Sequence, residues 1–191
     1  MNTSMESWLP RHRITVDEYY HMAQVGLLAH DARVELIEGE IFDMAPIGSR
    51  HGSIVSTLTH LLARAVGDHA VLRVQLPIRL SRSSEPQPDL ALVRPRKDLY
   101  AGSHPSAAET LLVIEVSQTT LRYDQRIKMP LYARHGIPEL WIFDLEHSQV
   151  HFFRSCEGEK YGDVSMTAEP GITALAADSS IAVDLTGLLK I

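Results

Sequence analysis

The sequence has little cysteine and no long apolar run. Cys156 is the single cysteine in 191 residues, which excludes an internal disulfide and a cysteine-based zinc cluster. We expect Cys156 to be a structural thiol. A run of about eighteen apolar residues, the minimum for a membrane-spanning helix, does not occur in the sequence. This absence predicts a protein without membrane segments.

A secretory signal and an excess of positive charge are also missing. Residues 1–8 contain neither a basic segment nor an apolar core followed by a cleavage site, so we expect a cytoplasmic protein. The 18 Lys and Arg residues are outnumbered by 24 Asp and Glu, and the net charge is −6. Proteins that hold nucleic acid over a wide surface need clustered Lys and Arg for the phosphates. Only local basic clusters remain for such a role, among them Arg122, Arg126 and Lys128.

Length and composition indicate one ordinary globular domain. Apolar residues make up 45% of the chain and charged residues 22%, and the length suffices for one hydrophobic core. We predict a flexible N-terminal arm over residues 1–13 and a single domain over residues 14–191.

Local patterns predict the elements of the N-terminal half. Thr15 and Glu18 form a capping-box pattern, so a helix is expected from about 16 to 28. The next expected elements are a hairpin of residues 34–37 and 40–44, and an amphipathic helix over 49–65, in which apolar residues recur at helical spacing. Two short strands, 71–76 and 78–80, follow in this prediction.

Two short apolar runs, 89–93 and 111–117, each carry one carboxylate and read as buried strands. If they pair as an antiparallel ladder, Asp89 lies beside Glu115, and both side chains can point to the same face. Two neighbouring carboxylates raise each other's pKa unless a cation lies between them. Such oxygen ligands suit Mg²⁺, with the carbonyl of Val116 as a further donor. The alternative for Asp89 is a strand-end residue that caps a turn.

The segments around these strands have their own signals. Residues 94–109 contain glycine, proline and small residues, and we expect a loop with at most one helical turn and the mobility of a flap. A helical segment then leads to a strand at 140–144, an order that predicts two parallel strands joined by a right-handed crossover. Pro130 predicts a kink or a restart of that helix. Residues 149–154 are expected to pair with the preceding strand, and 158–191 to hold one or two short strands.

The helical segment supplies a candidate lysine. Asp124, Lys128 and Tyr132 are spaced four apart and share a helix face, unless Pro130 breaks the register. Facing the carboxylates, Lys128 could orient or deprotonate an attacking water, and the alternative is an ordinary ion pair with Asp124. His51, at the start of the helix over 49–65, could donate to a phosphate or tune a ligand, and the alternative is a plain surface histidine.

These motifs resemble a known superfamily. Pro88-Asp89, Glu115-Val116-Ser117 and Lys128 look like the PD-(D/E)xK nucleases, in the variant where the lysine sits on the following helix. The flanking segments 35–40 and 139–144 are similar to the Uma2 family of restriction-endonuclease-like bacterial proteins, and the resemblance covers residues 14–153. In the commonest arrangement of the superfamily the lysine would occupy position 117, which is Ser117 here.

The resemblance implies a mixed α/β (α+β) fold, with a restriction-endonuclease-like sheet flanked by helices and extra N-terminal hairpin strands. It implies a Mg²⁺-dependent endonuclease that hydrolyses DNA, with Mn²⁺ as a possible substitute. Asp89, Glu115 and Lys128 would be catalytic, and Asp124 would support them. Glu35 matches an upstream acid that related nucleases add to the metal shell, although Glu38 and Glu40 compete for this role.

Two other functions remain open from the sequence. One is a binding or assembly module that keeps the nuclease fold but uses its acids structurally, which the negative net charge favours. The other is a hydrolase of small phosphoesters. Uncovered edge strands and three apolar residues expected at the surface, Trp8, Phe152 and Phe153, favour a homodimer.

Overall fold

The computed structural model describes residues 10–29 and 31–190, which form two compact units. The first unit contains the described residues of Met1–Met44 together with Ser81–Pro86, and the second contains those of Ala45–Leu80 and Gln87–Ile191. The single domain expected over residues 14–191 stays a prediction. Residues 1–9 of the expected arm lie outside the described residues.

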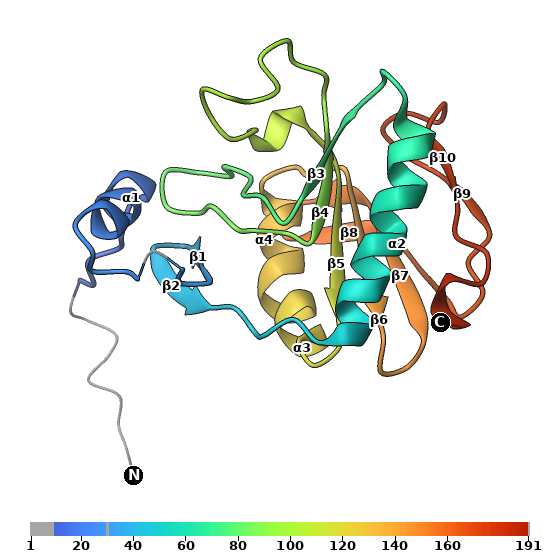
Figure 1. Cartoon of the computed structure of the whole chain (residues 1–191), viewed down its shortest axis with the longest axis horizontal. Helices are drawn as coiled ribbons and strands as arrows, with labels where there is room; N and C mark the ends of the chain where they lie inside the picture. Colours follow the sequence, from blue (N-terminus) through green and yellow to red (C-terminus); the bar gives the residue numbers. More distant parts are fainter. Residues whose placement is uncertain (1–9, 30, 191) are drawn as a thin grey trace. The chain divides into compact units, whose positions relative to one another are not determined.

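The first unit contains a helix and a hairpin (Figure 1). Helix α1, Val16–Gln24, begins with the expected capping box, in which the Thr15 hydroxyl accepts from the Glu18 amide at 3.3 Å and Glu18 accepts from the Thr15 amide at 2.7 Å. The helix ends earlier than the expected residue 28. Strands β1, Val34–Ile37, and β2, Glu40–Asp43, pair antiparallel as predicted.

The second unit is built on a mixed sheet, which confirms the predicted fold class. In the described part of the chain, six strands take the order β3-β4-β5-β6-β7-β8, with β5 and β6 parallel and the other pairs antiparallel. The strands are β3, Val71–Val74; β4, Leu90–Val93; β5, Thr110–Ser117; β6, Glu139–Asp144; β7, Gln149–Glu157; and β8, Lys160–Thr167.

The edges of this sheet differ from the prediction. No strand covers 78–80, where Arg79 makes an isolated bridge to Ser106. Residues 158–190 hold three strands, not the one or two short strands expected, and the first of them, β8, has eight residues. Most side chains of β8 are exposed, so its sequence has no apolar alternation that would predict its length. Beyond it, β9, Ile172–Ala174, pairs antiparallel with β10, Ala182–Asp184, and a short 3₁₀ helix, η3, covers Leu188–Lys190.

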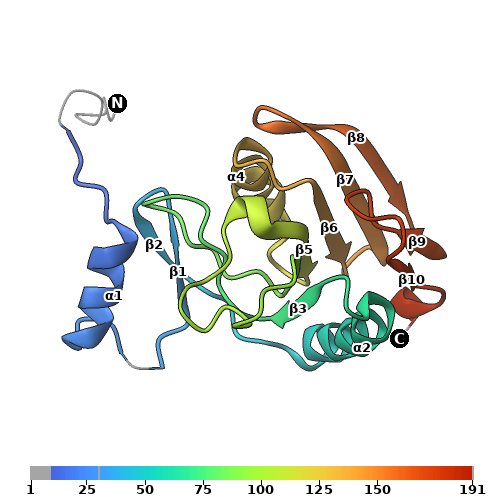
Figure 2. The ribbon, with the colours of Figure 1, turned by 90° about the horizontal axis from the view of Figure 1, so that it is seen from above.

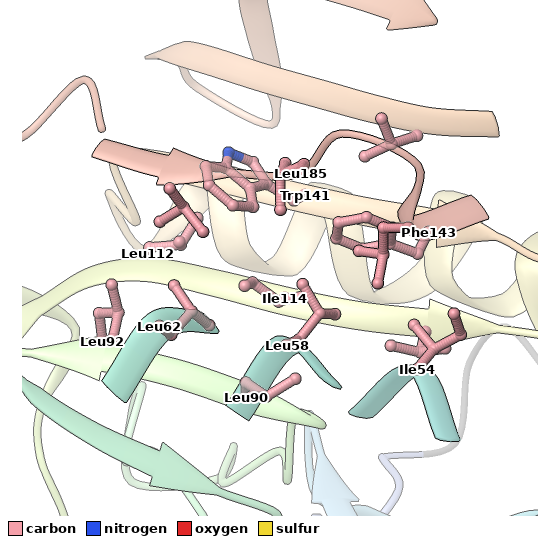
Figure 3. Close-up of a cluster of buried hydrophobic side chains, with 14 of the residues drawn as sticks. Ile54, Leu58, Leu62, Leu90, Leu92, Leu112, Ile114, Trp141, Phe143 and Leu185 are labelled. Atoms are coloured by element: carbon pink, nitrogen blue, oxygen red, sulfur yellow. The ribbon is translucent and has the colours of Figure 1, made fainter. Parts of the chain in front are cut away.

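Helices cover both faces of the sheet (Figure 2). Helix α2, Ser49–Val66, lays its apolar stripe on one face. Figure 3 shows this cluster, which contains Ile54, Leu58, Leu62, Leu90, Leu92, Leu112, Ile114, Trp141, Phe143 and Leu185. Helix α4, Met129–Arg134, covers the other face with Tyr132 and Ala133. Every residue of β4, β5 and β6 is therefore buried, and the candidate strands form the rigid centre of the unit.

The helical segment after β5 contains a π-helical turn. Helix α3, Leu121–Tyr123, runs into the π-helix η2, Asp124–Lys128, and then into α4, with right-handed helical dihedrals at both junctions. The Met129 amide donates to the Asp124 carbonyl, five residues back. Pro130 falls at the start of α4, where a missing amide is tolerated. The predicted irregularity is thus a widened turn before the proline.

Two surface expectations are wrong. Phe152 and Phe153 are buried, with 7% and 6% of their surface exposed, because β7 is an inner strand of the sheet. Trp8 lies outside the described residues.

The loop at 94–109 holds one 3₁₀ turn, η1, Ala107–Glu109, as predicted. No helix in the described ranges is long and apolar enough to cross a membrane.

Candidate active site

Asp89 and Glu115 lie on neighbouring strands in the predicted register. Leu90 of β4 pairs with Ile114 of β5, and the antiparallel register continued by one step sets Asp89 opposite Glu115. Asp89 directly precedes β4, at the end of the sheet where β5 finishes. Its backbone carbonyl accepts from the Gln75 amide at 2.8 Å, which joins this position to the end of β3.

The Asp89 carboxylate is held by three donors. Oδ2 accepts from the Val116 amide at 2.8 Å and lies 3.1 Å from His51 Nε2, while the Gln75 side-chain amide lies 3.4 Å from Oδ1. Burial raises the pKa of Asp89, but the bond and charge of His51, the Val116 amide and the charge of Lys128 outweigh it, so the pKa lies below its usual value. Asp89 is therefore ionised at neutral pH.

Glu115 is the acceptor for two buried donors on the crossover helix. Lys128 Nζ lies 3.2 Å and the Tyr132 hydroxyl 2.6 Å from Glu115 Oε1. All three side chains are buried, and the ammonium lies 5.8 Å from the ring centroid of Tyr123. Lys128 and Tyr132 thus share a helix face, as the spacing predicts, because Pro130 does not break the register between them. Asp124, expected on the same face, bonds Ser117 and Thr120 instead.

Asp124 faces the end of β5. The hydroxyls of Ser117 and Thr120 donate to its Oδ2 at 2.7 and 2.8 Å. Burial raises the pKa of Asp124, and the positive charge of Lys128 together with the two hydroxyls only partly offsets this. Ser117, at the position of the lysine in the commonest superfamily arrangement, thus supports Asp124.

The π-helical turn sets the positions of Asp124 and Lys128, its first and last residues. An α-helix stacks residues four apart, whereas a π turn takes five residues and rotates the second residue relative to the first. Asp124 can therefore face Ser117 while Lys128 faces Glu115. Turns of this kind occur frequently at functional sites.

His51 belongs to this site and is not a plain surface residue. It lies in the first turn of α2, and its side chain is 14% exposed. Nε2 contacts Asp89, while Nδ1 is buried without a hydrogen-bond partner among the described residues. Gln75 and Thr120 were not singled out from the sequence, because a lone glutamine after a strand and a threonine before a helix are common.

Glu35 lies in the first compact unit. It is a buried residue of β1, and its role as an added metal ligand stays a prediction. Glu38 occupies the hairpin turn with a positive φ of 50°, as a turn residue would. Glu40 forms an ion pair with Arg13.

The donor set agrees in type with a hard divalent cation. Mg²⁺ is usually held by one or two carboxylates, with waters and substrate oxygens in the remaining positions. Asp89 is ionised, and its Oδ1 has one long contact among the described residues, the 3.4 Å approach of Gln75. No group of three or more His, Cys, Asp or Glu side chains in the described ranges is placed to share a metal ion. The set expected from the sequence, Asp89, Glu115 and the Val116 carbonyl, contains two such side chains and stays a prediction.

Comparisons with known proteins agree with the fold. The model of the Uma2 family, described as "Putative restriction endonuclease", matches residues 16–184. A crystal structure from Anabaena variabilis, described as "a putative nuclease belonging to DUF820", is 18% identical. It matches with a TM-score of 0.68 over 93% of this chain and 98% of that chain, which is a likeness of fold. None of the curated proteins matches this chain.

Proposed function

Because the chain belongs to the Uma2 family of restriction-endonuclease-like proteins, we propose that it is a Mg²⁺-dependent endonuclease that hydrolyses DNA phosphodiester bonds. The main support is the convergence of Asp89, Glu115 and Lys128 at one end of the sheet. The Val116 amide donates to Asp89, the preceding residue Glu115 accepts from Lys128, and the Lys128 charge lowers the pKa of Asp89.

Asp89, Glu115 and the Val116 carbonyl would hold the Mg²⁺ ion, and Mn²⁺ could replace it. When bound, such an ion stabilises negative charge on a phosphate and lowers the pKa of a bound water. His51 and Gln75 fix the rotamer of Asp89, and Tyr132 fixes that of Glu115. These donors hold the two carboxylates in place before a substrate arrives.

Lys128 would orient the attacking water and offset the negative charge that builds up on the phosphate oxygens. Its ammonium lies beside Glu115, at the carboxylate face where the substrate phosphate would bind. Asp124 would support Lys128 by fixing the start of the helical run, because its carboxylate accepts from the hydroxyls of Ser117 and Thr120. Arg122 and Arg126, exposed on the same helical run, would contact the DNA backbone.

Nicking of supercoiled plasmid DNA tests the proposal. The wild type should nick in Mg²⁺ or Mn²⁺, and Asp89→Asn and Glu115→Gln should each lower the rate by about a hundredfold or more, since each removes a charge from the proposed metal site. Asp163→Asn, on the exposed strand β8, is the matched control and should nick like the wild type. Equal rates in all four proteins would end the proposal.

A binding or assembly module is the second candidate. Both acids already have donors within the protein, since Asp89 accepts from the Val116 amide and Glu115 from Tyr132 and Lys128. Calorimetric titration with Mg²⁺ separates the two functions, because the nuclease should bind the ion through Asp89 and the module should not bind it. A homodimer and a cytoplasmic location remain proposals.

A further inference from the structure

Arg73 is a buried cation outside the proposed active site. It lies on the edge strand β3, opposite Ala91 of β4, and has only 7% of its surface exposed. Its neighbour Val71, two residues back on the same strand, packs against the cluster of Ala91, Val113 and Tyr132, so Arg73 lies on the sheet face that α4 also covers. Arginine is rarely buried unless an acid pairs with it.

The partners of this guanidinium are few, and none of them is an acid. Nη2 lies 3.1 Å from His104 Nδ1, and the guanidinium carbon lies 5.5 Å from the centroid of the Tyr100 ring. Nε is buried without a hydrogen-bond partner, and no Asp or Glu among the described residues forms an ion pair with Arg73. Burial is the main cause that lowers the pKa of Arg73. The site therefore holds a positive charge that the protein leaves without a counter-charge.

The acidic residues of the loop that covers Arg73 pair with another arginine, Arg96. Residues 94–109 contain Asp98 and Glu109, and both pair with Arg96, at 2.6 and 3.5 Å. Arg96 lies over the ring of Tyr100 at 4.0 Å and is 29% exposed. The more exposed arginine thus has two carboxylates, while the buried Arg73 has none. If stability alone decided where the acids of this loop point, an acid would pair with the buried Arg73, because an unpaired buried charge costs more free energy than an exposed one.

The covering loop is also strained at Tyr100, whose ring lies near the Arg73 guanidinium, and at the residue before it. Leu99 and Tyr100 have positive φ angles of 48° and 66°, in the left-handed region that bulky residues seldom adopt. Many of the loop's bonds are internal, such as the Tyr100 hydroxyl to the Arg94 carbonyl at 2.7 Å and the Arg96 pair with Asp98. The loop is anchored where the Pro105 carbonyl accepts from the Arg79 amide at 2.8 Å, and a movement of the residues before this anchor would expose the guanidinium.

We propose that Arg73 and His104 form a phosphate subsite that binds a phosphodiester group of the nucleic acid next to the one being cleaved. This inference rests on the proposed nuclease function. A guanidinium presents a planar fork of donors that matches two phosphate oxygens, and Nε belongs to that fork. The subsite is joined to the active site through Gln75, two residues after Arg73, which bonds both the backbone and the side chain of Asp89.

DNA binding without cleavage is the first test. Fluorescence anisotropy with a labelled DNA duplex, in Ca²⁺ and over a series of KCl concentrations, should show that Arg73→Gln weakens binding about tenfold and lowers the salt slope by about one. Arg96→Gln is the matched control from the covering loop, and it should change affinity by less than about threefold, because its acids neutralise Arg96 already. Wild-type affinity and slope in folded Arg73→Gln would overturn the subsite.

A second measurement is independent of DNA and of the nuclease proposal. Potassium phosphate, compared with KCl of equal ionic strength, should raise the thermal midpoint of the wild type and of Arg73→Lys by more than that of Arg73→Gln, whose smaller rise measures the general effect of phosphate on folded proteins. If the wild type binds no DNA and phosphate still stabilises it through Arg73, the anion subsite stands and the nuclease proposal fails. If the wild type nicks DNA while phosphate stabilises Arg73→Gln equally, the subsite fails and the nuclease proposal stands.

Discussion

The hydroxyl of Tyr132 donates to Glu115 Oε1 at 2.6 Å, from a side chain with no exposed surface. Tyr132 lies on the crossover helix and Glu115 on the central strand that the helix covers. The bond therefore fixes a carboxylate of the proposed metal site from beneath, on the side away from solvent.

Removal of this hydroxyl should cost stability. We expect Tyr132→Phe to lower the free energy of unfolding by about 1.5–3 kcal/mol, the range for hydrogen bonds to charged groups. Tyr161→Phe is the control, because its hydroxyl donates to the neutral Ile137 carbonyl, which Cys156 also contacts, and its loss should be about 1 kcal/mol. Urea denaturation measures both, and equal losses would contradict a charged acceptor at Glu115.

Lys128 and Glu115 should show strong coupling. Lys128→Met leaves a buried carboxylate without its cation, and a loss of about 3–5 kcal/mol is expected. In the double variant with Glu115→Gln the loss should be smaller than the sum of the two single losses, since no buried charge remains unpaired. A double-mutant cycle from denaturation curves gives the coupling energy. Additive losses would mean that the two groups do not interact in solution.

Asp89 should contribute to stability at neutral pH but not in acid. Its pKa is lower in the folded protein than in the unfolded chain, so its contribution is present above the unfolded value of about 3.9 and is lost as pH falls through the folded value. The stability difference between wild type and Asp89→Asn should therefore shrink as the pH falls below about 4. Denaturation curves across this range test the sign, and a difference that grows in acid would contradict it.

Glu139 should hold the C-terminal segment. Its buried carboxylate accepts from Trp141 Nε1 and Arg154 Nε at 2.7 Å each, and from the Ala176 amide at 2.6 Å. Glu139→Ala leaves these donors unsatisfied, and a loss of about 3–5 kcal/mol is expected. Limited proteolysis should then cut near residue 176 faster than in the wild type. An unchanged cleavage pattern would show that other contacts hold the segment.

The sequence was sufficient for the two acidic positions, because buried strands carry dense apolar runs and an antiparallel register follows once the runs are paired. The positions of Asp89 and Glu115 were predicted in this way. Lys128 was named from the resemblance to the PD-(D/E)xK nucleases, and its spacing to Tyr132 placed both side chains on one helix face. Gln75 could not be found by such patterns, since its role depends on a single contact made by the chain just after β3.

Other features were hidden for different physical reasons. Arg73 on a short strand resembles any exposed basic residue, and its burial arises from a covering loop that has no periodic signal. Strand β8 has few buried side chains, so its sequence lacks the apolar alternation from which its pairing with β7 could be predicted. The π-helical turn was predicted only as an irregularity near Pro130. Residue spacing does not show whether a backbone amide bonds the carbonyl four or five residues back.

That turn sets where the chain can lose a residue. Arg126 and Ile127 are exposed, and an exposed helix position usually accepts change. The Met129 amide bonds the Asp124 carbonyl five residues back, so removal of either exposed residue would leave these two groups four apart, the spacing of an ordinary α-helix. The helix beyond Met129 should then keep its orientation, and Tyr132 its bond to Glu115. Substitutions at the two positions should leave the fold intact, and a one-residue deletion here should cost less stability than one inside α4, where it would rotate the following residues by about 100°.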